Sequence, residues 1–333
     1  MSQASKLVSL VIPVYNEESA IPHFLAAVRP VLEAEPDYRF EFIFVNDGSR
    51  DGSLELLLAA REEDPRIRIV DFSRNFGKEL ALAAGLQAAS GAAAIPMDAD
   101  LQDPPELISS FLRKWEEGYD VVVGVRKRRD ADTAFKRRSA AWFYAFFNYL
   151  CGRRLVPNAG DYRLMNRASL DALNSLPERV RFTKGLYAWV GFRQAIVLYD
   201  RPARVAGNTS WNVWKLWNFA LDGITSFSTF PLRIWSYIGF GVALLGFVYA
   251  AWLTARTLLF GVDVPGYPSQ MVALLVIGGL ILMSLGIIGE YLGRIFEESK
   301  GRPQYIVRSR IGFDAGAGEP PARCPHCGAP LSR

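Results

Sequence analysis

The 333-residue sequence contains few cysteines, little net charge and no apolar leader at its N-terminus. Its three cysteines form no even, regularly spaced set, which excludes a small secreted domain held together by disulfides. A net charge of +4 is too small to indicate a nucleic-acid partner. Because the first strand-like run follows residues 1–6 directly, with no signal-peptide core, we expect the N-terminal domain to stay in the cytoplasm.

The N-terminal part also lacks both of the common glycine-rich phosphate loops. Neither G-x-x-x-x-G-K-[ST] nor G-x-G-x-x-G occurs there. A site for a nucleotide diphosphate that is built without either loop favours a donor whose diphosphate leaves on a metal ion. The absence therefore favours sugar transfer over hydride or phosphoryl transfer.

Strand-like apolar runs alternate with helix-like patterns through the first 125 residues. Strands are expected at 8–13, 40–46, 66–72, 92–97 and 119–125, and helices at 17–33, 51–63, 78–89 and 104–117. Such alternation predicts parallel β-α-β units, and hence an α/β, Rossmann-like domain. Sheets of this kind bind ligands at the carboxyl ends of their strands.

Polar residues gather where three of these strands end. The runs are PVYNE at 13–17, NDGS at 46–49 and DAD at 98–100. The carboxyl ends of parallel strands meet at one edge of the sheet, so the three runs are expected to lie close together. Their convergence predicts a single binding site at that edge.

Asp98 and Asp100 are candidate ligands of a divalent metal. Two carboxylates at the end of a buried strand present the hard oxygen atoms that Mg²⁺ and Mn²⁺ prefer. The D-x-D pattern also arises by chance, so a pair of solvated loop acids is the alternative. Asp47 either accepts hydrogen bonds from a base or ribose or caps the helix that starts near Asp51. Residues 16–17 could likewise cap a helix.

Two long uncharged segments lie near the C-terminus, where the apolar excess of the chain is concentrated. Residues 234–255 and 264–289 contain no charged side chain, and each segment is long enough to cross a bilayer. We therefore predict a hairpin of two membrane spans. Arg233 precedes the hairpin and basic residues follow it, which places both of its ends, and the catalytic edge, on the cytoplasmic side of the inner membrane. Arg256, at the outer end, opposes this bias mildly.

Basic and aromatic residues surround the predicted hairpin. Residues 126–138 contain seven basic and two acidic side chains, and aromatic runs occur at 142–150 and 211–219. These runs are too short to span a bilayer but suit helices that lie in the membrane interface, with a core helix as the alternative for the first. The basic cluster can attract anionic headgroups, an acceptor phosphate, or both. Such a chain is also expected to self-associate.

The chain therefore divides into four predicted parts. They are a cytoplasmic catalytic domain (1–210), a juxtamembrane amphipathic helix (211–232), two transmembrane helices (233–293) and a cytoplasmic tail (294–333). The tail ends in a C-P-H-C run at 324–327. One C-x-x-C with one histidine cannot readily close a tetrahedral zinc site within the chain, so the end of the tail is either unstructured or shares zinc between subunits.

The strand-end runs, together with Gln102 and the GVR run at 124–126, resemble the motif set of family 2 glycosyltransferases with the GT-A fold. Within that family the chain is similar to the polyprenyl-phosphate enzymes, which include dolichol-phosphate mannose synthase and, more closely, bactoprenol glucosyltransferase. The FSRNFGKE run at 72–79 and the GEYLGR run at 289–294 fit the bacterial branch. The resemblance covers about residues 7–307. Asn46 departs from it, since many relatives have an aspartate there.

The resemblance implies a role for each matching residue. Nucleoside contacts fall to Pro13, Tyr15, Glu17 and Asp47; donor and metal contacts to Asp98, Asp100 and Gln102; and acceptor-phosphate contacts to Arg126, Arg138, Arg204 and Lys215. Asp98, Asp100 and Arg126 are the implied catalytic residues. The implied reaction is inverting transfer of a sugar, glucose by default, from a UDP-sugar to undecaprenyl phosphate with Mg²⁺ or Mn²⁺. A lipid phosphate is already an anion, so it needs positive charge and in-line positioning rather than a general base.

Other functions stay open from the sequence. A polyprenyl-phosphate mannosyltransferase that uses GDP-mannose differs only in its donor. A processive polysaccharide synthase would carry a Q-x-x-R-W motif and more spans, and the sequence has neither. Nucleotidyl transfer does not need the membrane hairpin. A membrane scaffold with an inactive nucleotide-binding domain would not need the acid pair or the arginine cluster.

Overall fold

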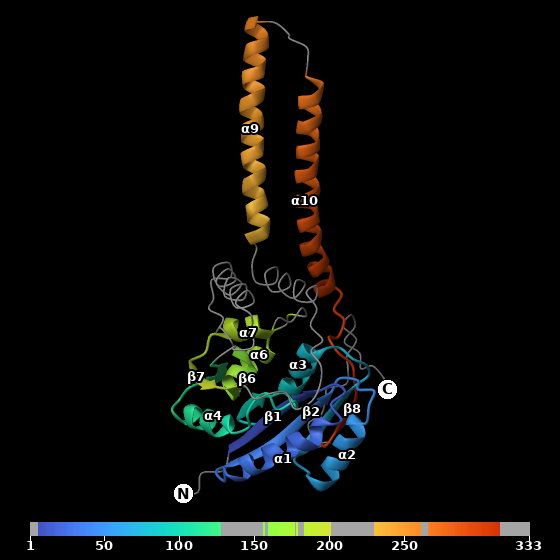
Figure 1. The fold of residues 1–333 in the computed structure, drawn as a ribbon, viewed down its shortest axis with the longest axis vertical. Coiled ribbons are helices and arrows are strands. Elements are labelled where there is room, and N and C mark those ends of the chain that lie inside the picture. Colours follow the sequence, from blue (N-terminus) through green and yellow to red (C-terminus); the bar gives the residue numbers. More distant parts are fainter. Residues whose placement is uncertain are drawn as a thin grey trace, which may run out of the picture.

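The computed structural model describes residues 6–127, 156, 159–176, 178, 183–200, 230–260 and 266–313. Within them the chain forms an α/β part, from which two long helices project side by side (Figure 1). The aromatic runs that are predicted to lie in the membrane interface, and the C-P-H-C tail, fall outside the described residues. Those predictions therefore stay predictions.

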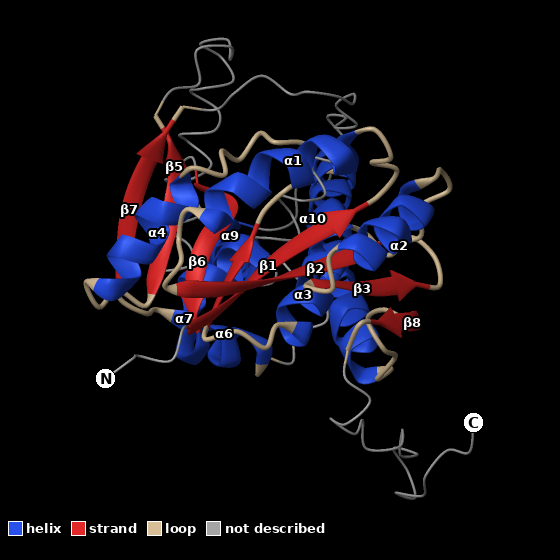
Figure 2. Ribbon diagram, turned by 90° about the horizontal axis from the view of Figure 1, so that it is seen from below, coloured by secondary structure: helices blue, strands red, loops and turns tan. Residues whose placement is uncertain are grey.

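One eight-stranded sheet forms the centre of the α/β part, with strand order β7-β5-β6-β4-β1-β2-β3-β8 (Figure 2). The strands are β1 (Lys6–Val14), β2 (Tyr38–Asn46), β3 (Ile67–Phe72), β4 (Ala93–Pro96), β5 (Val121–Arg126), β6 (Ala159–Asn166), β7 (Gln194–Tyr199) and β8 (Val307–Ile311). β1 is parallel to both β2 and β4, and β3 is parallel to β2. β6 runs antiparallel between β4 and β5, and β8 runs antiparallel to β3.

Helices cover both faces of the sheet and create two apolar cores. They are α1 (Ala20–Glu33), α2 (Ser53–Glu63), α3 (Lys78–Ala88), α4 (Leu107–Glu116), α6 (Arg167–Asn174) and α7 (Thr183–Val190). In β1, Leu10 and Ile12 pack with α1, α2 and α4, whereas Val11 packs on the other face with α3, α6 and α7. Successive side chains of a strand point to opposite faces, so a strand that is covered on both sides has a continuous apolar sequence.

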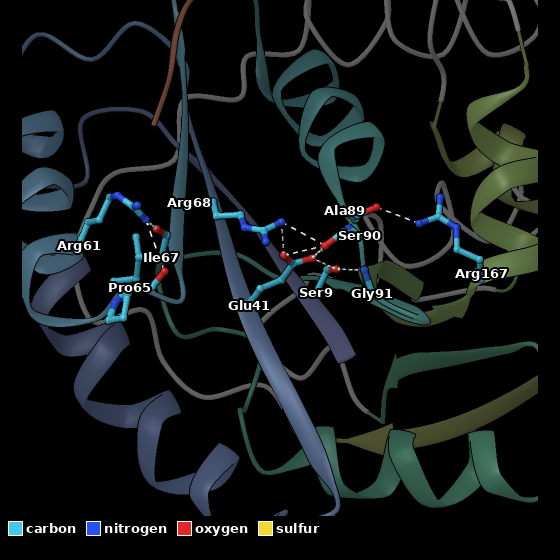
Figure 3. A network of polar contacts seen from close by, with 10 residues as sticks. All are labelled: Ser9, Glu41, Arg61, Pro65, Ile67, Arg68, Ala89, Ser90, Gly91 and Arg167. Atoms are coloured by element: carbon cyan, nitrogen blue, oxygen red, sulfur yellow. Dashed lines mark hydrogen bonds and ion pairs between the residues drawn. The ribbon is translucent and has the colours of Figure 1, made fainter. Parts of the chain in front are cut away.

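A buried polar network joins the sheet to the end of α3, near the amino ends of the strands (Figure 3). Glu41 is 3% exposed and forms an ion pair with Arg68 at 2.6 Å. It also accepts hydrogen bonds from the Ser9 hydroxyl and from the Ser90 amide, and Ser9 Oγ accepts one from the Gly91 amide. A buried carboxylate with these partners stabilises the sheet and leaves the opposite, carboxyl edge to bind ligands.

The first nine elements confirm the order of strands and helices that the sequence predicts, with ends that differ by a few residues. The antiparallel strands β6 and β8 were not predicted. Insertion of β6 between β4 and β5 makes the sheet mixed rather than wholly parallel, and it brings one more carboxylate, Asp161, to the carboxyl edge.

The two projecting helices are α9 (Phe230–Phe260) and α10 (Tyr267–Ser299). Large apolar side chains are exposed along both, including Phe247 on α9 and Leu282 on α10. Among the described residues, one stretch has the length and composition of a membrane span: Val276–Gly293, with a mean hydropathy of 1.8 and none of it buried in the protein. The apolar stretch of α9, Tyr237–Tyr249, is shorter. The second predicted span therefore stays a prediction.

After α10 the chain returns to the sheet. β8 pairs with β3 at its edge, where Ile311 lies opposite Ile69 and Ser309 opposite Asp71 (Figure 2). The sequence predicts a cytoplasmic tail for this part of the chain, and the structure corrects that prediction for residues 307–311. The strand VRSRI has alternating burial, with both arginines exposed, but it is only five residues long. The edge strand of the sheet next to β3 therefore comes from a part of the sequence that follows both long helices.

Candidate active site

The loops that follow β1 and β2 at the carboxyl edge are joined by hydrogen bonds. Asn16 Oδ1 accepts a hydrogen bond from the Arg50 amide at 2.8 Å, and Ser49 Oγ accepts one from the Asn16 amide at 3.0 Å. Asn16 has a φ of 55°, a left-handed conformation that asparagine adopts more readily than most residues. Because α1 begins only at Ala20, Asn16 links the two loops instead of capping the helix.

Asp47 is buried and organises the segment between β3 and α3. Its Oδ1 accepts a hydrogen bond from the Phe76 amide at 2.7 Å, and its Oδ2 accepts from the Gly77 amide at 2.9 Å and from Asn75 Nδ2 at 3.1 Å. Burial raises the pKa of the Asp47 carboxyl, and the two amides oppose this by favouring the charged form. The helix α2 begins at Ser53, so Asp47 does not cap it. Asp47 shapes the loop that a nucleoside would contact.

Gly48 allows the loop after β2 to touch the segment after β3. Its φ is +65°, and a Cβ atom at this position would lie 2.4 Å from the carbonyl carbon of Arg74 and 2.6 Å from the amide nitrogen of Asn75. Both neighbours are backbone atoms that cannot rotate away. Only glycine combines this conformation with this close approach.

The remaining nucleoside candidates lie at the same edge. Tyr15 is 44% exposed, whereas Pro13 and Glu17 are half-buried. All three follow or end β1, the central strand of the parallel part of the sheet. The structure brings them next to the Asp47 loop, and their nucleoside contacts stay a prediction.

Asp98 forms an ion pair with a lysine for which the sequence predicts no role. Lys78, the first residue of α3, places its Nζ 2.7 Å from Asp98 Oδ1 and 3.7 Å from Asp161 Oδ2 on β6. Burial lowers the pKa of Lys78, but the two carboxylates outweigh it and raise that pKa, so the side chain is an ammonium ion. Asp161 Oδ1 is buried and has no hydrogen-bond partner among the described residues. Asp161 is therefore an additional acidic residue of the site.

Asp100 and Gln102 provide further oxygen atoms in the loop after β4. Asp100 is 8% exposed, and its Oδ1 accepts a hydrogen bond from the Gln102 amide at 3.1 Å. Gln102 Oε1 is buried without a hydrogen-bond partner in the described part of the chain. That part contains no group of three or more His, Cys, Asp or Glu side chains arranged to hold a metal. The carboxylates of Asp98 and Asp100, together with the unbonded amide oxygen of Gln102, still fit a hard cation. Such a cation would complete its coordination with phosphate oxygens of a substrate.

Arg126, at the end of β5, is held by a tyrosine. Arg126 Nε donates to the Tyr199 hydroxyl at 3.3 Å, and this hydroxyl donates to Asp103 Oδ1 at 3.0 Å. Burial and the charge of Asp98 raise the pKa of Asp103 to about 6, and burial raises the pKa of Tyr199 to about 12. No carboxylate in the described residues lies within ion-pair distance of Arg126. Within the described part of the chain, Tyr199 therefore holds Arg126 by a hydrogen bond, and the Arg126 charge is not neutralised by a contacting carboxylate.

The remaining acceptor candidates, Arg138, Arg204 and Lys215, fall outside the described residues, so their roles stay predictions. Four residues of the site were missed on the sequence: Lys78, Asp103, Asp161 and Tyr199. Lys78 lies in the run at 72–79, and Asp103 directly follows the motif that ends at Gln102, so the charge of both residues was a usable signal. Asp161 and Tyr199 come from strands β6 and β7, which were not predicted.

A mixed α/β sheet with acidic and basic side chains at its carboxyl edge is the arrangement of glycosyltransferases with the GT-A fold. Residues 9–173 match the model of glycosyl transferase family 2, and residues 230–295 match the GtrB C-terminal hairpin. The chain belongs to glycosyl transferase family 2.

Curated relatives narrow the comparison. A bactoprenol glucosyl transferase of Shigella phage SfV is 49% identical over 302 residues, which cover 91% of this chain and 98% of that protein. An uncharacterized glycosyltransferase of Synechocystis is 51% identical over 306 residues, which cover 92% and 96%. Among solved structures, glucosyl-3-phosphoglycerate synthase from Mycobacterium tuberculosis, in complex with Mn²⁺, UDP-glucose and phosphoglyceric acid, has a TM-score of 0.45 and 19% identity, covering 67% of this chain and 79% of that one.

These comparisons confirm the predicted family, the GT-A-like fold and the assignment as a glycosyltransferase. The alternative of a non-enzymatic scaffold is thereby excluded. The hairpin match, together with the candidate span in α10, indicates association with a membrane.

Proposed function

We propose that the protein transfers glucose from UDP-glucose to polyprenyl phosphate, with inversion at the anomeric carbon, at the cytoplasmic face of the inner membrane. The observation that carries this proposal is the arrangement at the carboxyl edge. Arg126 is linked to Asp103 through the Tyr199 hydroxyl, and Asp98 lies close enough to Asp103 for its charge to raise the Asp103 pKa. Asp100 belongs to the same loop as Asp98, so acidic and basic groups meet at one edge of the sheet. The names of the relatives, bactoprenol glucosyl transferases, support the choice of sugar and acceptor.

On the donor side, Asp100 and Gln102 would hold Mg²⁺ or Mn²⁺, with Asp98 as a further ligand or a partner of the ribose and sugar. A bound metal ion would offset the negative charge that develops on the departing diphosphate. Lys78 already neutralises part of the charge of Asp98 at 2.7 Å, so Asp100 is the carboxylate best placed to serve a second cation. Pro13, Tyr15, Glu17 and the loop that Asp47 shapes would hold the nucleoside.

On the acceptor side, Arg126 would bind the phosphate of the lipid, with Arg138, Arg204 and Lys215 as further candidates. A phosphate monoester is an anion at neutral pH, so it attacks without a general base. The protein must bring it up to a negatively charged donor and align it with the anomeric carbon. A single direct displacement inverts that centre, so an α-linked donor gives a β-linked lipid-phosphate sugar.

We also propose that α9 and α10 both cross the membrane and that the chain self-associates through its hairpin region. α9 has 31 residues, and at about 1.5 Å per residue it exceeds the roughly 30 Å of a bilayer core. A hairpin with both ends in the cytoplasm presents the carboxyl edge to cytoplasmic nucleotide sugars and to the lipid phosphate of the same leaflet.

The test uses the purified full chain in detergent or nanodiscs with undecaprenyl phosphate, Mg²⁺ and a panel of UDP- and GDP-sugars. Mass spectrometry of the lipid product identifies the sugar, and NMR of the purified product identifies its anomeric configuration. We expect a β-linked hexosyl lipid phosphate from UDP-glucose. A product from GDP-mannose alone would replace the donor assignment with the mannosyltransferase alternative, and a growing polysaccharide without a lipid-phosphate monosaccharide would contradict the proposal.

A further inference from the structure

The segment between β3 and α3, residues 73–78, is held at three points by different parts of the chain. Its middle is bound by Asp47, through the amides of Phe76 and Gly77. Its end, Lys78, is bound to Asp98. Its beginning, Ser73, is bound by residues that follow the membrane hairpin. We call residues 73–78 the donor segment, because it touches both the candidate nucleoside loop and the candidate metal carboxylates.

Residues that follow the hairpin form hydrogen bonds with both the amide and the carbonyl of Ser73. The Ser73 amide donates to the Ile306 carbonyl at 3.0 Å, and Arg308 donates from a terminal guanidinium nitrogen to the Ser73 carbonyl at 3.0 Å. These bonds extend the pairing of β8 with β3 past the end of the strand, where the register shifts. The first residue of the donor segment therefore belongs to the same hydrogen-bonded unit as β8.

Tyr305 adds an aromatic contact to this unit. Its ring stacks on Phe72 with centroids 4.9 Å apart and planes 19° apart, and its hydroxyl donates to Gln87 Oε1 near the end of α3 at 2.6 Å. Phe76, in the donor segment, packs edge-on against the same Phe72 ring at 5.6 Å. Tyr305 thus contacts both the end of β3 and the end of α3.

Arg308 is also linked indirectly to the loop after β2, through the buried polar side chains of Asp71 and Asn46. Its guanidinium lies 3.5 Å from Asp71 Oδ2, and Asp71 is 2% exposed. Asp71 Oδ1 accepts a hydrogen bond from Asn46 Nδ2 at 2.7 Å, and Asn46 Oδ1 accepts one from the Ser49 amide at 3.2 Å. A buried carboxylate is costly unless it is paired, so this relay links the position of β8 to the loop beside Asp47.

The link to the membrane is short. α10 ends at Ser299, and Tyr305 is already docked on Phe72 six residues later. Six residues reach at most about 20 Å when fully extended. Figure 1 shows α10 descending toward the side of the sheet where β8 lies.

We propose that residues 305–311, which comprise Tyr305 and the strand β8, are a positioning element of the donor site, in which Arg308 and Tyr305 fix the donor segment and so couple the membrane hairpin to nucleotide-sugar binding. Neither residue touches the reacting atoms. The consequence for nucleotide-sugar affinity rests on the proposed function, whereas the consequence for the donor segment itself does not.

The experiment compares Arg308→Ala with Arg302→Ala in the full chain. Arg302 is an exposed arginine of the same post-hairpin stretch, for which the structure shows no contact with Asp71 or Ser73. Hydrogen–deuterium exchange reads the donor segment without any ligand. We expect at least about fivefold faster exchange at the amides of Phe76 and Gly77 in Arg308→Ala, and no change in Arg302→Ala. Unchanged exchange at these amides in Arg308→Ala overturns the proposal.

Kinetics then separates positioning from general loss of structure. Arg308→Ala should raise the KM for UDP-glucose about fivefold to tenfold while the KM for undecaprenyl phosphate changes less than twofold, and Arg308→Lys should recover part of the loss. Tyr305→Phe, which removes the hydroxyl that donates to Gln87 and keeps the ring on Phe72, provides a milder variant should Arg308→Ala fold poorly, and it should show the same pattern at about twofold to threefold. Equal increases in both KM values would overturn the coupling to the donor. Faster exchange in an enzyme that binds neither UDP nor GDP would instead mean that the proposed function is wrong while the positioning role stands.

Discussion

The two carboxylates of the D-x-D motif have different bonding partners. Lys78 binds Asp98 at 2.7 Å, whereas Asp100 is more buried and bonds to the amide of Gln102. An ammonium ion and a divalent cation repel each other, so they are best served by different carboxylates. We infer that Asp100 contributes more than Asp98 to any metal-dependent step.

The first prediction follows from this division. Asp100→Ala should lower sugar transfer by about a thousandfold, because a metal ion that stabilises the leaving group is worth several kcal/mol. Initial rates in detergent with Mg²⁺ measure the loss, and circular dichroism checks that the variant is folded. Full turnover of Asp100→Ala in the presence of EDTA would show that this carboxylate holds no catalytic metal.

Arg126 and Tyr199 form a second unit that can be tested by paired substitutions. Arg126→Ala should raise the KM for lipid phosphate about tenfold or more, with a smaller effect on the KM for UDP-glucose, because a charge-assisted hydrogen bond to phosphate contributes about 1.5–3 kcal/mol. Tyr199→Phe should shift the same parameter by about fivefold, since it removes the hydroxyl that holds Arg126 Nε.

Tyr162→Phe is the matched control for Tyr199→Phe. Tyr162 is also buried, and its ring packs edge-on against Tyr199, but its hydroxyl donates to the Pro104 carbonyl at 2.8 Å instead of bonding to Arg126. Steady-state kinetics with each substrate varied in turn distinguishes the two tyrosines. Should Arg126→Ala affect both KM values equally, the acceptor role of Arg126 would have to be abandoned.

At the scale of elements, the loop after β2 depends on one backbone conformation. Gly48→Ala would place a Cβ atom 2.4 Å from the Arg74 backbone at a φ of +65°, so we expect it to destabilise the fold by about 2–4 kcal/mol. Gly52→Ala is the control. The nearest atoms to its Cβ would be the carboxylate end of the Glu18 side chain, 2.9 Å away, which can rotate aside at the cost of its hydrogen bond from the Gly52 amide. Chemical denaturation of the two variants should differ by at least about 1.5 kcal/mol, and equal stabilities would show that the close approach to Arg74 is relieved by a small shift of the loop.

The sequence predicted the elements whose signals are local. β1 to β5 and α1 to α4 are apolar runs or periodic helices, and strand ends mark Asp47, Asp98 and Asp100 as site residues. β6 and β8 were not predicted, because neither contains an apolar run: β6 includes Asp161 and Arg163, and β8 is five residues long with two arginines. Asp161 and Arg308 therefore became visible only once pairing was known. Lys78 could have been found, since it begins α3 within the FSRNFGKE run, but its partner Asp98 is 20 residues away.

The whole molecule combines the carboxyl edge of the sheet with a C-terminal hairpin, and the residues after the hairpin are tied back to the sheet. Because β8 belongs to the sheet, the hairpin is an insertion between two strands of one α/β domain, β7 and β8. The donor is water-soluble and the acceptor is a lipid, so both must meet at a fixed distance from the bilayer. A sheet that is anchored through β8 limits how far the catalytic edge can tilt away from the lipid phosphate.

This arrangement predicts the topology of the chain. In a variant whose three native cysteines are replaced by serine, Phe260→Cys should react with a membrane-impermeant maleimide added to intact cells, because Phe260 ends α9 at the far side of the hairpin and is 83% exposed. Arg39→Cys, on an exposed position of β2, should react only after the membrane is permeabilised. The reason is the positive-inside rule, since basic residues flank the hairpin on the side of the sheet and the far end carries only Arg256. Labelling of Arg39→Cys in intact cells would show that the topology is the inverse of the predicted one. The carboxyl edge would then be separated from cytoplasmic nucleotide sugars. Protection of both positions would mean that α9 and α10 lie on the membrane without crossing it.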